Sequence, residues 1–423
     1  MVEKRGVEIR MERRRVVITG MGTINPLGHN LKDTWEAVKQ GKCGIAPITL
    51  FDTSERKVSL AGEVKDFNPE EYLDKREVRK MDRFTQFALV AAKEAFADAA
   101  FDLESVDRSR FGVIVSSGIG GMQTFQDECL KGAEKGYDRV TPHFIPMMIA
   151  NMAAGRIAIE YGLHGMCNCV VTACAGATNA IGDAFRHIRD GYADAMVTGG
   201  AEASITTLGL GGFTTLQALN RTTDPMRASI PFDKERAGFV MGEGAGILIL
   251  EEYEHAVARG AKIYCEIVGY GANCDAYHVT APLEDGSVAA ECLKLALRDG
   301  NVAAEDVNYI NAHGTSTHLN DKGETKAIRT AFGAHADKLM VSSTKSMTGH
   351  LLGASGAVEG IITAMSICDN FVPATINYRE PDPECDLDIV PNEGREVTVN
   401  YAMSNSLGFG GHNATILLKK VAL

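Results

Sequence analysis

The sequence predicts an α/β fold built from two similar halves. Short runs of β-branched and apolar residues alternate with segments of helical length along the chain, and this alternation is typical of a sheet covered by helices. The order of strand, glycine turn and helix rich in small residues occurs over 108–200 and again over 306–418. A chain of 423 residues is also too long for one small core, so two units are expected.

The first half is expected at 13–260, after an extension at 1–12 that we expect to be disordered. Its elements are read from apolar runs that end in glycine turns and from longer segments of helical composition. In chain order they are a strand in RVVITGMG, a mostly buried helix over 84–100, a strand in RFGVIVSSGIGG, a strand-to-helix turn from CNCVVTACAG into ATNAIGDAFRHIRDG, a strand in ADAMVTGGAEA, and a strand with its helix in AGILILEEYEHAVARGA.

The second half is expected at 261–423. No low-complexity tract or Pro/Ser-rich linker separates it from the first half, so we expect the halves to pack tightly. Its elements are a strand in KIYCEIVGYGANCD, the helix SVAAECLKLALRDG, a strand in VNYINAHGTSTHLND, the helix KGETKAIRTAFG, the segment MVSSTKSMTGHLLGASGAVEGIITAMSI, and a strand pair around AMSNSLGFGGHNATILLKK.

Composition excludes several classes of protein. A net charge of −12 argues against nucleic acid as a partner, although it permits a local basic patch. Ten cysteines without CxxC pairs or a zinc-type spacing predict free thiols in a reducing cytoplasm and no metal site. No apolar run approaches the roughly 18 residues needed to span a bilayer, and no signal-peptide core precedes the first strand, so we expect no membrane association.

Cys174, in VVTACAGATNAIG, lies between a short apolar run and a helical segment, with small residues on both sides. At such a turn the positive end of the helix dipole favours a thiolate, and free backbone N–H groups can hold an oxyanion. A buried structural cysteine in a tight turn fits the local sequence equally well. Both interpretations remain open at this point.

Two histidines follow apolar runs in the second half. His313 stands in NAHGTSTHLND at the end of a strand, and His350 in a turn rich in Gly and Ser, five residues after Lys345. Either alone is more often a structural residue. Together with Cys174 at the matching place in the first half they form a stronger pattern, because open α/β sheets gather ligands at strand ends.

Two glycine-rich segments have different interpretations. In SNSLGFGGHN, three glycines around Phe409 would let the backbone approach a ligand and let the ring move, although a hairpin turn with one buried aromatic residue is the alternative. GFVMGEGAG has the spacing of neither a dinucleotide fingerprint nor a phosphate loop, so nucleotide binding is not expected.

Taken together, TACAG, NAHGTST, STKSMTGHLLGASG and NSLGFGGHN resemble the motifs of the β-ketoacyl-acyl carrier protein synthases, the decarboxylating condensing enzymes of fatty-acid synthesis. The resemblance runs from about Arg15 to Leu418 in the family's order, and includes RASIPFDKERAGFVMGEGAG. The subgroup it resembles most is type II, which elongates long acyl chains. The resemblance implies a thiolase-like αβαβα layered fold, a homodimer, and acyl carrier protein in acyl and malonyl forms as the partner.

The resemblance also implies roles for the candidate residues. Cys174 would accept the acyl chain from the phosphopantetheine thioester, and His313 and His350 would stabilise the enolate formed when malonyl carrier loses carbon dioxide. The N–H groups of Cys174 and Phe409 would hold the oxyanion of the condensation. Because carbon dioxide loss drives the reaction, no metal or redox cofactor is expected.

Supporting roles follow from the same resemblance. Lys345 would position the histidines, with Asp321, Glu324 and Glu359 as its partners. The substrate would contact five other side chains: Thr315 and Thr317 on the pantetheine arm, Phe409 as a mobile gate, and Ile119 and Phe213 in the acyl pocket.

An acidic carrier requires basic docking residues on this acidic chain. Arg79 and Lys80, in KREVRK, correspond to basic contacts of the family, and Arg139 is a third candidate. Where relatives carry a further basic residue, this chain has Leu216 and Gln217, so the carrier contact is expected to be weaker or differently placed.

The same motifs distinguish this chain from some other classes of protein but not from all. A type I short-chain synthase and a polyketide ketosynthase share all three catalytic residues and stay open. A thiolase uses a second active cysteine and a type III initiating synthase has Asn in place of the second histidine, and His350 argues against both. A silent chain-length factor replaces the nucleophile, whereas this chain retains Cys174.

Overall fold

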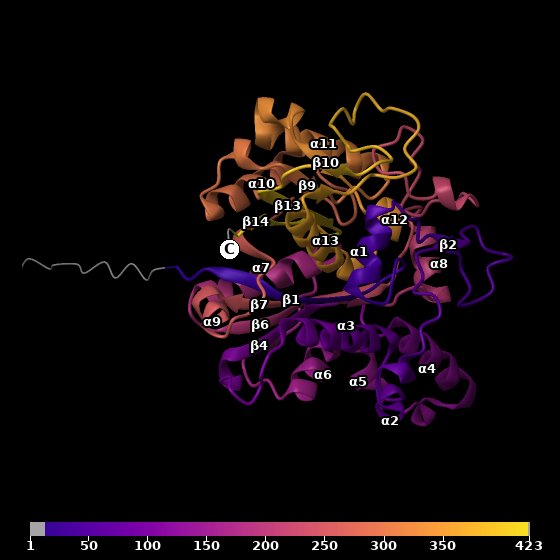
Figure 1. The fold of residues 1–423 in the computed structure, drawn as a ribbon. Coiled ribbons are helices and arrows are strands. Elements are labelled where there is room, and N and C mark those ends of the chain that lie inside the picture. Colours follow the sequence, from indigo (N-terminus) through magenta and orange to yellow (C-terminus); the bar gives the residue numbers. More distant parts are fainter. Residues whose placement is uncertain (1–12, 422–423) are drawn as a thin grey trace, which may run out of the picture.

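The computed structural model describes residues 13–421, and the predicted extension at 1–12 lies outside the described residues. Figure 1 shows a layered α/β molecule in which α7 (Gly176–Arg189) and α13 (Ser355–Asp369) lie between two sheet regions. Helix α3 (Arg83–Ala99) covers the outer face of one region and α10 (Ser287–Gly300) that of the other. This is the predicted five-layered αβαβα fold.

The two sheet regions have the same topology. Each region contains five strands. Counted along the chain within their own region, these strands lie side by side in the order third, second, fourth, fifth and first, with the third at the outer edge. The two first strands, β1 and β8, pair antiparallel through Val16–Ile18 and Cys265–Ile267, which joins the regions into one ten-stranded sheet. The strands in spatial order are β5 (Cys167–Asn168), β4 (Phe111–Ser116), β6 (Ala195–Glu202), β7 (Gly244–Glu252), β1 (Val16–Ile24), β8 (Cys265–Cys274), β14 (His412–Lys419), β13 (Tyr401–Gly408), β9 (Tyr309–Asn311) and β10 (Met340–Ser342).

The predicted elements coincide with observed ones. The helix expected over 84–100 is α3, which begins after the N-cap Asp82, whose carboxylate accepts the N–H of Phe84. The helices at 31–39, 75–78, 122–135, 144–148, 152–161 and 207–215 were not predicted. The remaining helices are α1 (Leu31–Lys39), α2 (Lys75–Val78), α4 (Met122–Lys135), α5 (Phe144–Met148), α6 (Met152–Tyr161), α8 (Thr207–Thr215), α9 (Tyr253–Ala258), α11 (His318–Phe332) and α12 (Lys345–Thr348), and two short sheets pair β2 (Ala46–Pro47) with β3 (Leu60–Ala61) and β11 (Phe371–Val372) with β12 (Arg395–Glu396).

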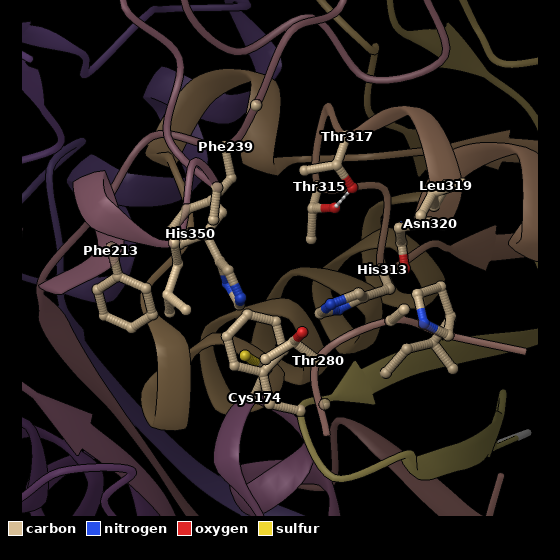
Figure 2. A pocket seen from close by; sticks show the side chains of 18 of the residues that line it. Cys174, Phe213, Phe239, Thr280, His313, Thr315, Thr317, Leu319, Asn320 and His350 are labelled. Atoms are coloured by element: carbon tan, nitrogen blue, oxygen red, sulfur yellow. Dashed lines mark hydrogen bonds between the residues drawn. The ribbon is translucent and has the colours of Figure 1, made fainter. Parts of the chain in front are cut away.

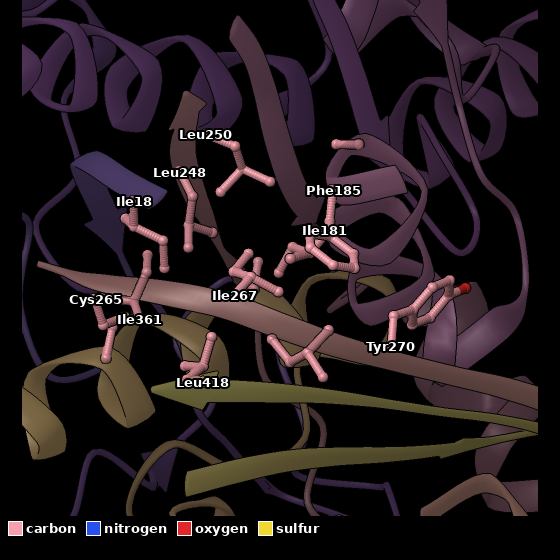
Figure 3. Packing of buried hydrophobic residues seen from close by; sticks show 14 of the residues in the cluster. Ile18, Ile181, Phe185, Leu248, Leu250, Cys265, Ile267, Tyr270, Ile361 and Leu418 are labelled. Carbon is pink, nitrogen blue, oxygen red and sulfur yellow. The ribbon is translucent and has the colours of Figure 1, made fainter. Parts of the chain in front are cut away.

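The central core lies between the two sheet regions, where Ile181 of α7 and Ile361 of α13 pack with Ile18 and Leu418 of the sheet (Figure 3). These side chains are fully buried, so the halves share one apolar core rather than touching at a polar interface. Residue 260 lies in the turn between α9 and β8, and the boundary there stays a prediction. None of the helices described within 13–421 is long and apolar enough to cross a membrane.

Candidate active site

A cavity of about 320 Å³ lies where the two halves meet. Cys174, from the first half, and His313 and His350, from the second, all line it, although they are far apart in the sequence. Figure 2 shows both imidazole rings pointing toward the space in front of Cys174. The rest of the cavity lining is largely apolar, as is common for sites that bind small molecules.

Cys174 lies in the single 3₁₀ turn Ala173–Ala175 (η4) that leads into α7. Ala173 has φ +49°, a left-handed conformation that is strained for a residue with a side chain. The turn can press against the sheet because Gly176 has no side chain: a Cβ there would lie 2.1 Å from Ser116 Oγ. The predicted strand-to-helix turn is therefore present, and it carries backbone strain at the residue before the cysteine.

The end of β13 lies directly against this turn. A Cβ on Gly408 would lie 3.2 Å from the backbone nitrogen of Cys174 and 2.9 Å from the carbonyl oxygen of Thr172. This close approach brings the backbone of Phe409 beside Cys174, and the N–H groups of Phe409 and of Cys174 itself act to lower the pKa of the thiol. Two backbone donors thus converge on the position of the sulfur.

Burial raises the pKa of the Cys174 thiol to about 12. The positive charge of Lys345 and the N–H of Phe409 act in the opposite direction, and the carboxylate of Glu202 adds to the increase. Burial of Cys174, which is 8 % exposed, therefore opposes the thiolate. That the helix dipole favours the thiolate stays a prediction.

The rings of His313 and His350 meet edge to face, with centroids 5.2 Å apart and planes at 86°. Burial lowers the pKa of both imidazoles well below the usual value, and the charge of Lys345 lowers them further. Both rings are therefore neutral at neutral pH. A neutral imidazole can donate one hydrogen bond and accept another.

Different groups hold the two histidines. His350 Nδ1 lies 2.8 Å from Ser355 Oγ at the start of α13, and its ring packs against that of Phe239 at 5.3 Å. When the Ser355 hydroxyl donates to Nδ1, the proton of His350 is on Nε2. Sequence reasoning missed Ser355 and Phe239, because a serine among small residues and an aromatic among glycines give no local sign of contact with a histidine.

His313 is held through its backbone. Its N–H and that of Gly314 donate to the two oxygens of Glu324, each at 2.8 Å. Within residues 13–421, His313 Nδ1 has no hydrogen-bond partner although it is buried. A lone pair costs less to bury without a partner than an N–H does, so this favours the proton on Nε2 for His313 as well.

Lys345 forms a buried ion pair with Glu359 and with neither of the other two predicted partners. Glu324 instead binds the backbone of the His313 turn, and burial raises its pKa to about 7. Asp321 accepts the N–H of Phe232 at 2.9 Å and faces Arg236 at 3.6 Å. The expectation that Asp321 and Glu324 partner Lys345 was therefore wrong, because α11 directs their carboxylates to other segments.

The predicted substrate contacts lie at or near the cavity. The hydroxyls of Thr315 and Thr317 are 2.9 Å apart and line it. Phe409 and Phe213 also line it, with ring centroids 6.4 Å apart. Ile119 does not line the cavity directly but packs into the apolar cluster that contains Cys174, so the cluster extends the site inward.

The predicted docking residues lie in short elements of the first half. Arg79 and Lys80 follow α2, and Arg139 ends the 3₁₀ turn after α4. Arg79 and Arg139 are exposed, whereas Lys80 pairs with Glu77 at 2.6 Å. Helix α4 contacts the start of α8, where Gln126 accepts a hydrogen bond from the Thr207 hydroxyl.

A cysteine and two neutral histidines in one buried cavity, on a duplicated αβαβα fold, define a condensing acyltransferase. The chain belongs to the beta-ketoacyl synthase family: the N-terminal domain of that family matches residues 13–256, and its C-terminal domain matches residues 264–379.

Individual relatives are similar along nearly their whole length. The chain is 53 % identical over 411 residues to the 3-oxoacyl-[acyl-carrier-protein] synthase 2 of Synechocystis sp., covering 97 % of this chain and 99 % of that protein. It is also 53 % identical over 409 residues to the enzyme of the same name from Staphylococcus aureus, with the same coverage. Among solved structures, a ketosynthase in complex with its type II PKS acyl-carrier protein, bound to the hexaketide, superposes with a TM-score of 0.89 at 36 % identity, covering 97 % of this chain and all of that one.

Proposed function

We propose that the protein elongates acyl chains by two carbons in fatty acid biosynthesis, joining malonyl-acyl carrier protein to an acyl thioester on Cys174. The observation that carries this function is the convergence of Cys174, His313 and His350 in one cavity, together with 53 % identity to enzymes named 3-oxoacyl-[acyl-carrier-protein] synthase 2. The lower identity of 36 % to a type II PKS ketosynthase favours this function over a polyketide one.

In the first step, the sulfur of Cys174 attacks the thioester carbonyl of the acyl carrier. The bond between that carbonyl and the pantetheine sulfur breaks, and the cysteine proton leaves with the pantetheine thiol. The raised pKa of Cys174 means that the proton is lost only as the carbonyl is attacked. The N–H groups of Cys174 and Phe409 stabilise the tetrahedral oxyanion.

In the second step, malonyl carrier loses carbon dioxide. The electron pair of the breaking carbon–carbon bond forms an enolate, and the Nε2–H groups of His313 and His350 donate to its oxygen. The Ser355 hydroxyl maintains that tautomer of His350. Because both imidazoles are neutral, they stabilise the enolate without protonating its carbon.

In the third step, the enolate carbon attacks the acyl carbonyl on Cys174. A carbon–carbon bond forms, the thioester to Cys174 breaks, and the cysteine takes up one proton. The products are 3-oxoacyl carrier, carbon dioxide and free carrier. Loss of carbon dioxide makes the sequence irreversible, so the proposed chemistry requires no metal or redox cofactor.

The partner that delivers both substrates is, in this proposal, acyl carrier protein. Exposed Arg79 and Arg139 would meet its acidic surface, and the hydroxyls of Thr315 and Thr317 would bind its pantetheine arm. A structural neighbour is a ketosynthase in complex with such a carrier, which supports this partner. Lys80 would contribute less to carrier binding, because its ammonium group already forms an ion pair with Glu77.

We also propose a cytoplasmic homodimer. Edge strand β5 has a described neighbour on one side only, and Met166 and Val171 beside it are 42 % and 57 % exposed. A second copy would cover this edge. All ten cysteines, which fall within residues 13–421, are free thiols, in keeping with a reducing compartment. Sedimentation of the purified protein tests the dimer.

The function is tested by intact-protein mass spectrometry after mixing the protein with a long-chain acyl carrier. We expect the acyl mass to appear on the wild type and not on Cys174→Ala, and to be released as 3-oxoacyl carrier when malonyl carrier is added. A folded wild type that gains no mass from any straight-chain acyl carrier would overturn the fatty-acid function.

A further inference from the structure

Glu202 is a fully buried carboxylate that none of the proposed chemical steps uses. It ends strand β6, at the edge of the apolar cluster that contains Cys174. Its charge is one of those that raise the pKa of Cys174, and burial raises its own pKa to about 7. Burying a carboxylate costs free energy unless hydrogen bonds compensate, so its contacts indicate why it is present.

The carboxylate binds backbone groups from both halves of the fold. Glu202 Oε2 accepts the N–H of Gly118 at 2.8 Å and that of Gly353 at 3.0 Å. Glu202 Oε1 accepts the N–H of Ile119 at 3.3 Å and the hydroxyl of Ser204 at 2.9 Å. The turn after β4 and the turn after His350 are therefore attached to one side chain.

The contacts of the Glu202 carboxylate with the two turns depend on two glycines. A Cβ on Gly118 or on Gly353 would lie 2.8 Å from Glu202 Oε2, and one on Gly353 would lie 2.2 Å from the nitrogen of Gly118. The two turns can approach each other and the carboxylate only because neither residue has a side chain. This close packing defines their separation.

Both turns carry an apolar side chain toward the nucleophile. Ile119 and Leu352 belong to the same cluster as Cys174, and Leu352 also lines the cavity. Leu352 has φ +49°, a strained conformation that persists only when its neighbours hold it. The hydrogen bond from Gly353 to Glu202, one residue further on, is such a restraint.

We propose that Glu202 is a positioning residue that sets the distance between Ile119 and Leu352 and thereby the acyl-chain length the enzyme accepts. This inference rests on the proposed function, because it concerns the same acyl pocket. A short chain on Cys174 would stay beside the sulfur. In this proposal a long chain extends from Cys174 into the cluster that contains Leu352 and Ile119, so it alone senses their separation.

The test is Glu202→Gln. A glutamine places an NH₂ group where one carboxylate oxygen was, so at least one of the N–H groups of Gly118, Ile119 and Gly353 faces a donor or loses its acceptor. The rate of acylation of Cys174 is measured by mass spectrometry with butyryl and palmitoyl carriers. We expect the ratio of palmitoyl to butyryl rates to fall about tenfold, with the butyryl rate nearly unchanged.

Two further variants keep the test decisive. Ser204→Ala removes one donor to Glu202 and should lower the ratio in the same direction by about twofold to threefold, even if Glu202→Gln does not fold. Glu251→Gln is the control, because Glu251 is as buried as Glu202 but binds Arg259 and His255 away from the cavity. It should leave the ratio unchanged.

An unchanged ratio in folded Glu202→Gln, or an equal decrease in Glu251→Gln, would overturn the inference. So would an unchanged ratio in Ser204→Ala if Glu202→Gln fails to fold. Failure of the proposed function looks different, since the wild type itself would then accept neither acyl chain.

Discussion

The imidazole rings of His313 and His350 stand nearly perpendicular to each other with centroids 5.2 Å apart, although the two residues are 37 positions apart in the sequence. Each is held by a separate support, the Ser355 hydroxyl for His350 and the backbone contacts of Glu324 for the His313 turn. Two neutral donors with fixed orientation can share one enolate oxygen. Their separate supports mean that each ring can be removed without moving the other.

Removal of either histidine should separate the two half-reactions. We expect His313→Ala and His350→Ala each to lower condensation by at least about 100-fold, while acylation of Cys174 falls by less than about tenfold. Carbon dioxide release and acyl-enzyme mass measure the two steps. His335→Ala, whose ring binds the carbonyl of Val307 outside the cavity, is the control. Condensation at the wild-type rate in either variant would contradict the proposed enolate contact.

The buried Lys345–Glu359 pair should affect stability and activity differently. Lys345→Met leaves Glu359 without its partner, and loss of one member of a buried pair costs about 3–5 kcal/mol of unfolding free energy. Replacing both, with Lys345→Met and Glu359→Leu, should restore most of that stability in urea unfolding but not condensation. A double variant that condenses normally would show that the pair serves folding alone.

Gly408→Ala should slow acylation without unfolding the protein. The added Cβ would press on the backbone of Thr172 and Cys174, and a displacement of about 1 Å at a nucleophile can cost about 100-fold in rate. Gly155→Ala is the matched control, because the nearest atom to its new Cβ is Met152 Sδ at 3.9 Å. If Gly408→Ala acylates as fast as Gly155→Ala, the close approach of β13 is not needed for the reaction.

The free energy of unfolding should depend on pH in the way expected for a buried neutral imidazole. Burial lowers the pKa of His313 below 6.5, its ordinary value, so the unfolded chain binds more protons in mild acid. The contribution of this group is present above pH 6.5 and is lost as the pH falls below it. In urea unfolding from pH 7.5 to 5, the wild type should lose up to about 1.4 kcal/mol per pH unit relative to His313→Gln. A difference independent of pH would contradict a neutral His313.

Charge reversal at the predicted docking residues should affect carrier binding. Arg79→Glu with Arg139→Glu should raise KM for acyl carrier protein about tenfold and leave kcat nearly unchanged, because both residues are exposed and outside the cavity. Arg298→Glu, on α10 at the opposite end of the molecule (Figure 1), is the control. The effect should shrink at high salt; a KM equal to that of the control would place the carrier elsewhere.

Local patterns were sufficient to predict most elements and the candidate residues. The helix at 84–100 and the turn at Cys174 are visible because apolar spacing, glycines and small residues act over a few positions. The helices α1, α2, α4, α5, α6 and α8 were not predicted; α4 and α5 bury no apolar side chain, so their positions depend on tertiary contacts rather than on a buried apolar face. The three central residues of the site and the Lys345–Glu359 pair were predicted, whereas Ser355, Phe239 and the contact of Glu324 with the His313 turn were not.

Local sequence was enough to identify the available chemistry: a cysteine at a strand-to-helix turn, a histidine just after strand β9, and a second histidine that follows α12 rather than the expected strand end. Which charged side chains form ion pairs, by contrast, depends on the tertiary structure. Three carboxylates were candidates for Lys345, and only packing of α12 against α13 selects Glu359, while α11 turns Asp321 and Glu324 toward other segments. The tertiary structure likewise determines how strongly burial raises the pKa of Cys174, and it places the Glu202 carboxylate between two turns. Burial and long-range contacts depend on residues distant in the chain, so no local pattern records them.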